Sequence, residues 1–194
     1  MAGNEVRIIG GIWKGRKLRF PAIADLRPTL GRARGSLFNW LAGEIHGARC
    51  LDLFAGSGAL GFEALSRGAA HVAFVERNRN AAQAIRDNIA QLEAANAEVF
   101  AIPAQRFLRR QGPAWDIIFL DPPFTSKDFA QTLELIQQLG LLQPDGRVYF
   151  ERPRRQSLPA SPHWQVAKAN HAGDTQFGLL RLTQPQTPDQ NLSV

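Results

Sequence analysis

The sequence contains little cysteine and no long hydrophobic run. Its 194 residues include one cysteine, Cys50, which excludes an intrachain disulfide framework and a cysteine-rich zinc site and favours a reducing compartment. No apolar stretch reaches the roughly 18 residues that a membrane-spanning helix needs, and no basic and then apolar leader opens the chain. We therefore expect a soluble, cytoplasmic protein.

Histidine is also scarce. The four histidines at 46, 71, 163 and 171 lack the spacing of metal ligands, so we expect no metal site. Ser57 does not lie in a Gly-x-Ser-x-Gly elbow, which argues against a hydrolase. The chemistry must therefore come from other residues.

Positive charge is concentrated at the N-terminus. The formal net charge is +6, and eight basic residues against two acidic ones in residues 1–34 account for the whole surplus. With Trp13 and Phe20 interleaved, this segment favours RNA through counterion release and base stacking, although a solvated charged face is the alternative. The expected RNA contacts are Arg7, Lys14, Arg16, Lys17, Arg19, Arg27, Arg32 and Arg34.

The order of predicted elements indicates an α/β fold. Two short strands surround a turn near residue 14, and Thr29 resembles the N-cap of a helix that reaches residue 43. Strands then alternate with helices, and several strands are continuous apolar runs, which predicts a doubly wound, mostly parallel sheet covered on both faces. Strands are expected at 49–54, 71–76, 98–102, 116–120, 147–151, 164–168 and 177–182, and the last two should form a hairpin at the edge of the sheet. Helices are expected at 59–67, 79–94 and 127–139, together with a short helix that ends at residue 110.

A glycine-rich turn follows the first strand of this alternation. Gly56-x-Gly58-x-x-Gly61 matches a dinucleotide fingerprint, and Glu76 lies at the end of the next strand, where it can accept hydrogen bonds from ribose hydroxyls. The motif alone fits either a nicotinamide dinucleotide or S-adenosylmethionine, but a carboxylate at Asp52 suits a cationic amino acid group and repels a pyrophosphate. The expected S-adenosylmethionine ligands are Asp52, Phe54, Ala55, Gly56, Ser57, Gly58, Glu76 and Ala104.

The decisive motif is Asp121-Pro122-Pro123-Phe124, directly after the fourth strand and so at the same edge of the sheet. The two prolines fix their φ angles and remove two N–H donors, which leaves a rigid array of acceptors. The carboxylate and a main-chain carbonyl can accept both hydrogens of an amino group while the phenylalanine ring stacks on the base. We therefore predict that these four residues form a catalytic site for methylation of an amino nitrogen.

These motifs resemble a known family. Segments 7–11, 15–18, 26–29, 37–41 and 51–68 are similar to the bacterial 16S ribosomal RNA guanine-N2 methyltransferases of the RsmD type, and the resemblance extends over residues 6–182. It implies a seven-stranded class I methyltransferase sheet with one antiparallel strand, and a guanine of small-subunit RNA as substrate. We accordingly expect a basic, RNA-binding hairpin and helix at 1–45, a methyltransferase domain at 46–183 and a disordered tail at 184–194.

Two positions depart from the family pattern. Gly35 stands where a glutamate usually follows the Arg-x-Arg of the first helix, which weakens this helix and removes a partner for Arg32 or Arg34. Pro103 stands where an Asp or Asn usually faces the adenine, so we expect adenine recognition to rest on the main chain of Ala104.

The resulting prediction is a monomeric enzyme that acts on 16S ribosomal RNA or on a small-subunit assembly particle, with no membrane partner. Within the same chemistry, methylation of DNA adenine N6 or of a protein glutamine is the alternative. From other classes, a nicotinamide oxidoreductase and a non-catalytic RNA-binding domain also remain open, although neither accounts for Asp121 and the two prolines after it.

Overall fold

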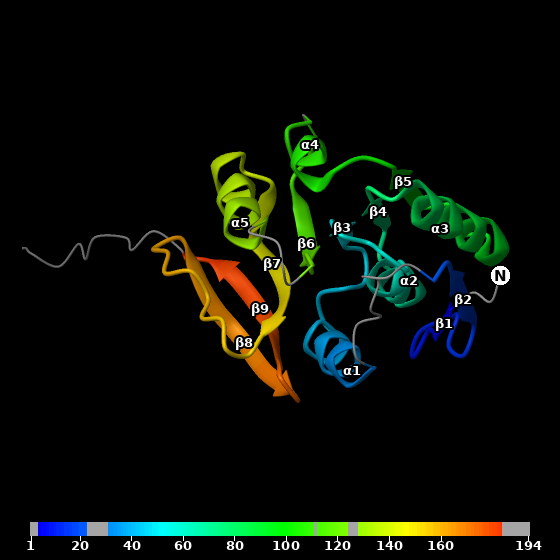
Figure 1. Ribbon diagram of the computed structural model, residues 1–194, viewed down its shortest axis with the longest axis horizontal. Coiled ribbons are helices and arrows are strands. Elements are labelled where there is room, and N and C mark those ends of the chain that lie inside the picture. The colour runs from blue at the N-terminus through cyan, green and yellow to red at the C-terminus, as the bar shows by residue number, and fades with distance from the viewer. Residues whose placement is uncertain (1–3, 23–30, 111, 124–127, 184–194) are drawn as a thin grey trace, which may run out of the picture.

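The computed structural model describes residues 4–22, 31–110, 112–123 and 128–183. These residues form a small hairpin and a seven-stranded sheet flanked by helices (Figure 1). The N-cap expected at Thr29 lies outside the described residues. In chain order the elements are β1 (Asn4–Arg7), β2 (Lys17–Phe20), α1 (Gly31–Trp40), β3 (Arg49–Asp52), α2 (Ala59–Ser66), β4 (His71–Val75), α3 (Arg79–Leu92), β5 (Ala97–Phe100), α4 (Ala104–Leu108), β6 (Trp115–Leu120), α5 (Asp128–Gln138), β7 (Leu142–Pro153), β8 (Trp164–Ala172) and β9 (Thr175–Leu182).

The large sheet has the strand order β5-β4-β3-β6-β7-β9-β8. Strands β3 to β7 are parallel to one another, and β9 is antiparallel to both β7 and β8. The expected mostly parallel sheet, its single antiparallel strand and the hairpin at its edge are therefore confirmed. The chain winds outwards from β3 to β5 and then returns to place β6 on the other side of β3, so the switch point of the topology lies between β3 and β6.

Two strands are longer than their sequence predicted. β7 begins at Leu142, because Leu142 pairs with Trp115 before an irregularity in the β6–β7 register. The intervening Pro144, Asp145 and Gly146 are typical of a turn and concealed this part of the strand. β8 extends to Ala172 because its polar half pairs with β9, and as an edge strand it needs no buried face there.

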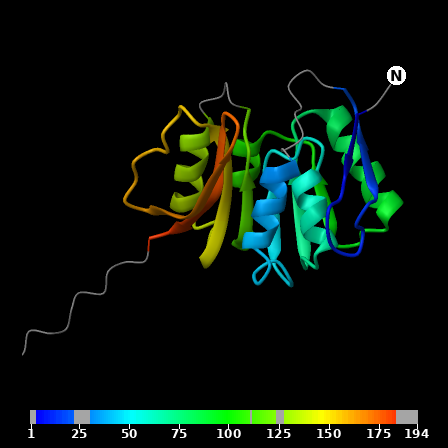
Figure 2. The same cartoon turned by 90° about the horizontal axis from the view of Figure 1, so that it is seen from below.

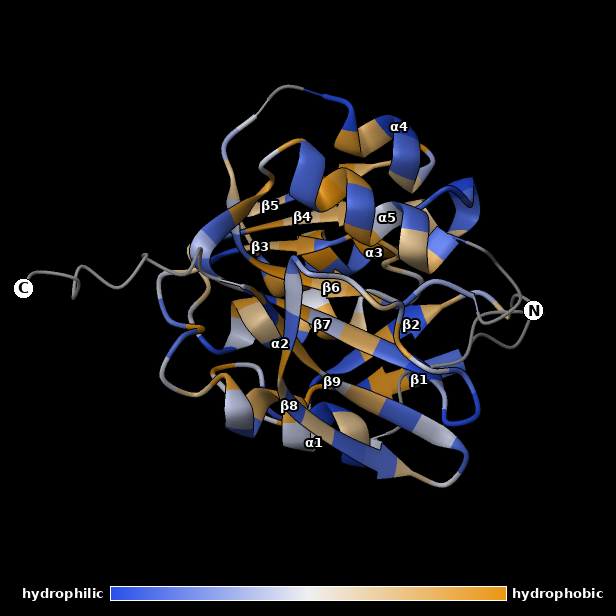
Figure 3. Cartoon of the chain, turned by 90° about the vertical axis from the view of Figure 1, so that its left-hand side faces the viewer, coloured by the Kyte–Doolittle hydropathy of each residue, from blue (hydrophilic) through white to orange (hydrophobic). Residues whose placement is uncertain are grey.

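The helices cover both faces of the sheet. Buried residues of α1, α2 and α3 pack with one face, and those of α4 and α5 pack with the other. Figure 2 shows α1 and α2 side by side in front of the sheet. Figure 3 shows the inner strands as largely hydrophobic and the edge strand β8 as largely hydrophilic. Two layers of helix around a buried parallel sheet follow from these apolar strands.

The N-terminal hairpin shares the core of the first face. Ile8 and Leu18 are buried in the same cluster as Leu37 and Phe38 of α1. Asn88 of α3 also fastens the edge of β2, since its side chain accepts from the Arg19 N–H (3.1 Å) and donates to the Arg19 carbonyl (2.9 Å). Within the described part of the chain, no helix is long and apolar enough to cross a membrane.

Candidate active site

The motifs predicted from the sequence meet at the carboxyl edge of the sheet. Asp52 at the end of β3 is in register with Phe74 of β4 and Phe119 of β6. Beyond the strands, the Leu53 N–H donates to the Phe119 carbonyl (3.1 Å) and the Ala55 N–H donates to the Val75 carbonyl (3.0 Å). The glycine-rich turn therefore lies between the ends of β4 and β6, and β6 leads directly into the Asp121 motif.

Each glycine of the turn has a separate structural reason. Gly56 and Gly58 have φ angles of 53° and 76°, in the left-handed region that side chains avoid. Gly61 allows α2 to pack closely on β4, because a Cβ there would lie 2.2 Å from the Phe74 ring. Gly56 and Gly58 give the turn its left-handed backbone, whereas Gly61 sets the distance between helix and strand.

Asp52 is a buried carboxyl group at the base of this turn. It is 3% exposed and accepts a hydrogen bond from the Gly61 N–H at 3.0 Å. Burial raises the pKa of Asp52 from 3.8 to about 7, the Gly61 hydrogen bond lowers it in part, and the nearby charge of Glu76 raises it further. A buried carboxylate of this kind is stabilised by an added cation, so the site fits the ammonium group of S-adenosylmethionine.

Glu76, directly after β4, links the glycine-rich turn to the start of α3. Its Oε2 accepts from the Gly56 N–H at 2.9 Å, and its Oε1 accepts from the Asn78 N–H at 2.7 Å. Asn78 in turn caps α3. A carboxylate has about four acceptor positions, so these two bonds hold the group in place while leaving capacity for ribose hydroxyls.

The remaining expected cofactor ligands lie around the same edge. Ala55, Ser57 and Ala104 are buried, and Phe54 is half-buried against the second core. Ala104 begins α4 directly after Pro103, which occupies the N-cap position without a side-chain hydrogen bond. Main-chain recognition of adenine at Ala104 therefore stays a prediction.

The Asp121 motif begins where β6 ends. Asp121 is half-buried, Pro122 is buried and Pro123 is exposed, whereas Phe124 lies outside the described residues. The charge of Asp121 contributes to raising the pKa of Tyr149 on β7, behind burial and Glu151, which shows that Asp121 and Tyr149 are neighbours. The first three residues of the motif thus stand beside the glycine-rich turn on one side and β7 on the other.

Two polar residues of β7 were not expected from the sequence to belong to the site. The Tyr149 hydroxyl donates to Oε2 of Glu151 at 3.0 Å, and the two residues are 0% and 6% exposed. Burial raises the pKa of Glu151, and the hydrogen bond from Tyr149 opposes this effect. A glutamate at the end of the otherwise apolar run Val148 to Phe150 was the available signal.

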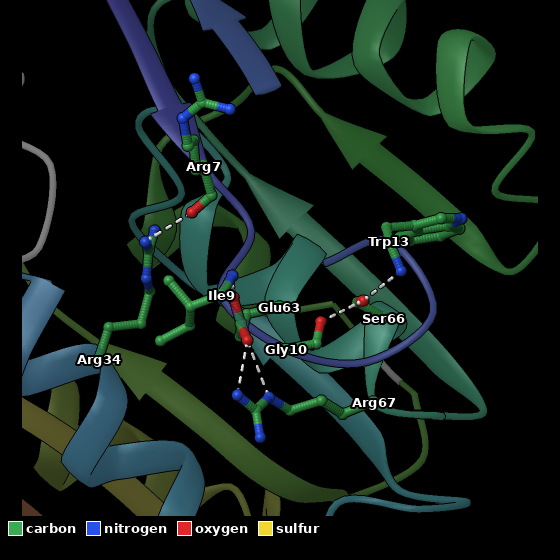
Figure 4. Close-up of polar contacts among 8 residues, drawn as sticks. All are labelled: Arg7, Ile9, Gly10, Trp13, Arg34, Glu63, Ser66 and Arg67. Carbon is green, nitrogen blue, oxygen red and sulfur yellow. Dashed lines mark hydrogen bonds and ion pairs between the residues drawn. The ribbon is translucent and has the colours of Figure 1, made fainter. Parts of the chain in front are cut away.

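The basic N-terminal residues divide into two groups. Arg27 lies outside the described residues, and Arg34 is 3% exposed. The Arg34 Nη2 donates to the Arg7 carbonyl at 2.7 Å, and burial lowers the pKa of Arg34 (Figure 4). Arg34 therefore holds the hairpin against α1 and does not present its charge at the surface. The exposed members are Arg7, Lys14, Arg16, Lys17, Arg19 and Arg32.

Side chains of α2 hold the turn of the hairpin in place by hydrogen bonds. Glu63 accepts from the Ile9 N–H at 2.9 Å and pairs with Arg67, while Ser66 Oγ accepts from the Trp13 N–H and donates to the Gly10 carbonyl (Figure 4). Because α2 starts at the carboxyl edge of the sheet, Ser66 at its last turn lies near the amino edge. The hairpin turn is thus fixed at the edge opposite Asp121.

The sheet order, the glycine-rich turn and the two carboxylates define a class I methyltransferase that uses S-adenosylmethionine. Comparison with known proteins then specifies the family. The model of the family described as "Conserved hypothetical protein 95" matches residues 6–181. The chain belongs to this family, which is the RsmD family of ribosomal RNA methyltransferases.

Individual relatives agree with this assignment. The chain is 43% identical to the Ribosomal RNA small subunit methyltransferase D of Escherichia coli, over 92% of this chain and 90% of that protein. It is 39% identical to the protein of the same name from Haemophilus influenzae, over 93% of this chain and 95% of that protein. The solved structure of yhhF from Escherichia coli has a TM-score of 0.84 at 42% identity and covers 92% of this chain and 98% of that one.

Proposed function

We propose that this chain transfers a methyl group from S-adenosylmethionine to the exocyclic N2 of a guanine in 16S ribosomal RNA. The observation that carries the proposal is the meeting of Asp52, Glu76 and Asp121 at one edge of the sheet, beside the topological switch point. The names of the relatives support a small-subunit ribosomal RNA as the substrate.

In this proposal the cofactor site is formed by β3 and β4. When bound, S-adenosylmethionine supplies a methyl carbon activated by a sulfonium, and the carbon–sulfur electron pair returns to sulfur as the methyl is transferred. Asp52 binds the amino acid end, Glu76 binds the ribose hydroxyls, and the backbone of the turn from Phe54 to Gly58 encloses the methionine end.

The target amino group is held by the Asp121 motif. Asp121 and a main-chain carbonyl of the Pro-Pro loop accept the two amino hydrogens, which orients the nitrogen lone pair towards the methyl carbon. Asp121 also stabilises the positive charge that develops on nitrogen, and the departing proton leaves through its carboxylate to water. Phe124 supplies the stacking platform, and Pro122 and Pro123 keep the acceptors rigid.

RNA would be held mainly by the N-terminal segment, which we assign as residues 1–45 beside a methyltransferase domain at 46–183. The exposed basic residues of the hairpin bind phosphates, and the guanine is extruded from its stack to reach Asp121. Because the hairpin turn lies near the amino edge, Lys14 would contact RNA far from the target base. The enzyme acts as a cytoplasmic monomer on ribosomal RNA or on an assembly particle.

Replacement of Asp121 by alanine tests the mechanism. The single-turnover methylation rate of small-subunit RNA should fall by at least about 100-fold, as for loss of a preorganised polar contact. Affinity for S-adenosylmethionine should stay unchanged, because Asp121 does not contact the cofactor in this proposal. Asp145→Ala is the matched control, since Asp145 is exposed in the turn-like first part of β7. Methylation at the unmodified rate by Asp121→Ala would refute the amino-nitrogen mechanism.

Further measurements separate the alternative functions. A non-catalytic RNA-binding domain would show no methylation in any variant, and a nicotinamide oxidoreductase would bind NAD in calorimetry. Mass-spectrometric mapping of the methylated RNA identifies the base and atom, which distinguishes guanine N2 from adenine N6. A DNA or protein substrate would be revealed by methylation of those polymers and not of ribosomal RNA.

A further inference from the structure

Glu151 lies beside Asp121 on the adjacent strand. In the parallel β6–β7 pair, Phe119 is in register with Tyr149, and Leu120 is in register with Phe150. Side chains alternate along a strand, so Glu151 is directed to the same face as Tyr149, and the charge of Asp121, the residue directly after β6, acts on Tyr149 as well. The carboxyl groups of Asp121 and Glu151 therefore both lie near Tyr149 at the carboxyl edge, on or directly after neighbouring strands about 4.8 Å apart.

Glu151 has a buried carboxylate whose orientation is fixed by a neighbouring hydroxyl group. Oε2 is oriented by the hydroxyl of Tyr149, and no Lys or Arg of the described residues forms an ion pair with this 6% exposed side chain. On the next strand Phe177 is in register with Glu151 and stacks on Trp40 of α1, with ring centroids 5.7 Å apart. Burial of a carboxylate is costly, which favours a functional reason for its presence.

The chemistry of the bases gives such a reason. In guanine, the exocyclic amino group at C2 lies between two ring nitrogens, N1–H, which is a hydrogen-bond donor, and N3, which is an acceptor. In adenine and in cytosine, the ring nitrogen next to the amino group is an acceptor. A second carboxylate beside the one that holds the amino group therefore matches guanine and repels the other two amino bases.

We propose that Glu151 accepts the N1–H of the target guanine while Asp121 accepts from N2, which makes Glu151 the residue that selects guanine. This inference rests on the proposed function and deepens it. Tyr149 is a positioning residue, because its hydroxyl fixes the orientation of the Glu151 carboxylate. Guanine would then be recognised by two adjacent acceptors on neighbouring strands.

The test compares guanosine with 2-aminopurine riboside at the target position of the RNA. The analogue keeps the reacting amino group at C2, but its N1 is an acceptor. At pH 8 the wild-type enzyme should show kcat/KM about 100-fold higher for guanosine, as expected when a buried acceptor loses its donor. Glu151→Gln should reduce this preference at least tenfold, because the amide can rotate and donate to the unprotonated N1.

Controls separate recognition from folding. Glu134→Gln, at an exposed position of α5, should keep the full preference for guanosine. Tyr149→Phe should reduce the preference partly, and it decides the question if Glu151→Gln does not fold by thermal melting. An equal preference in wild type, Glu151→Gln and Tyr149→Phe would overturn the role of Glu151, whereas failure of the wild type to methylate guanosine would overturn the proposed function itself.

Discussion

Replacement of Asp52 by asparagine should make the protein more stable and its cofactor binding weaker. The asparagine carbonyl can still accept from the Gly61 N–H, which Asp52 does at 3.0 Å, and the side chain keeps its shape. What the substitution removes is a negative charge in a position that is 3% exposed. The free protein therefore loses an unfavourable buried charge, and the bound state loses its partner for the ammonium group.

The magnitude follows from the pKa. A folded-state pKa of about 7, against 3.8 ordinarily, means that folding favours the neutral carboxyl. The stability from this group is complete below pH 3.8 and is lost as the pH rises through 7. At pH 8 the free energy of unfolding is lower by roughly 4 kcal/mol because of this group. At pH 5 the folded protein binds the proton, and the free energy of unfolding is lower by roughly 2 kcal/mol. The Asp52→Asn substitution should recover up to these amounts.

Urea unfolding at the two pH values measures the stability, and calorimetry measures the affinity for S-adenosylmethionine. We expect the gain in unfolding free energy to be larger at pH 8 than at pH 5, and the affinity to fall by about 10-fold to 100-fold, as for a lost charge-assisted hydrogen bond. Asp145→Asn, at an exposed position, should change neither. An equal gain at both pH values, or a loss of stability at pH 8, would contradict the assignment of Asp52 as a carboxylate whose ionised form is destabilised by burial.

Two further predictions concern the cofactor and the RNA. Glu76→Ala should weaken S-adenosylmethionine binding by roughly 1.5 to 3 kcal/mol, and NAD should bind to neither protein; tight NAD binding in calorimetry would reject the cofactor assignment. Replacing Arg16 and Lys17 by alanine should lower RNA affinity and reduce the salt dependence by up to about 0.7 to 0.9 log units per lost phosphate contact, whereas Lys168→Ala on β8 should have little effect. If the dependence of RNA affinity on salt concentration does not change, the alternative interpretation holds and the hairpin is a solvated charged face.

The local pattern of the sequence was enough to predict the architecture and to locate the motifs. Hydrophobic periodicity separated strands from helices, because each element must bury one face or stripe. The glycine-rich turn and the Asp121 motif both follow buried strands, and parallel strands end at one edge, so their convergence could be anticipated. The left-handed Gly56 and Gly58 were likewise foreseeable, since only glycine adopts that conformation readily.

Only the tertiary structure decided which charged and polar side chains are exposed and which groups they bond to. Arg34 belongs by sequence to a basic cluster, but contact with the Arg7 carbonyl, 27 residues away, buries it. Glu151 reads as the polar end of an apolar strand, and only the pairing of β7 with β6 brings it close to the end of β6, which Asp121 follows. Glu63 and Ser66 look like polar residues of an amphipathic helix until the hairpin covers them, 54 and 56 residues away in the chain. Local periodicity determines which face of an element is buried, whereas the burial and hydrogen bonding of a charged group depend on which distant segment packs against it.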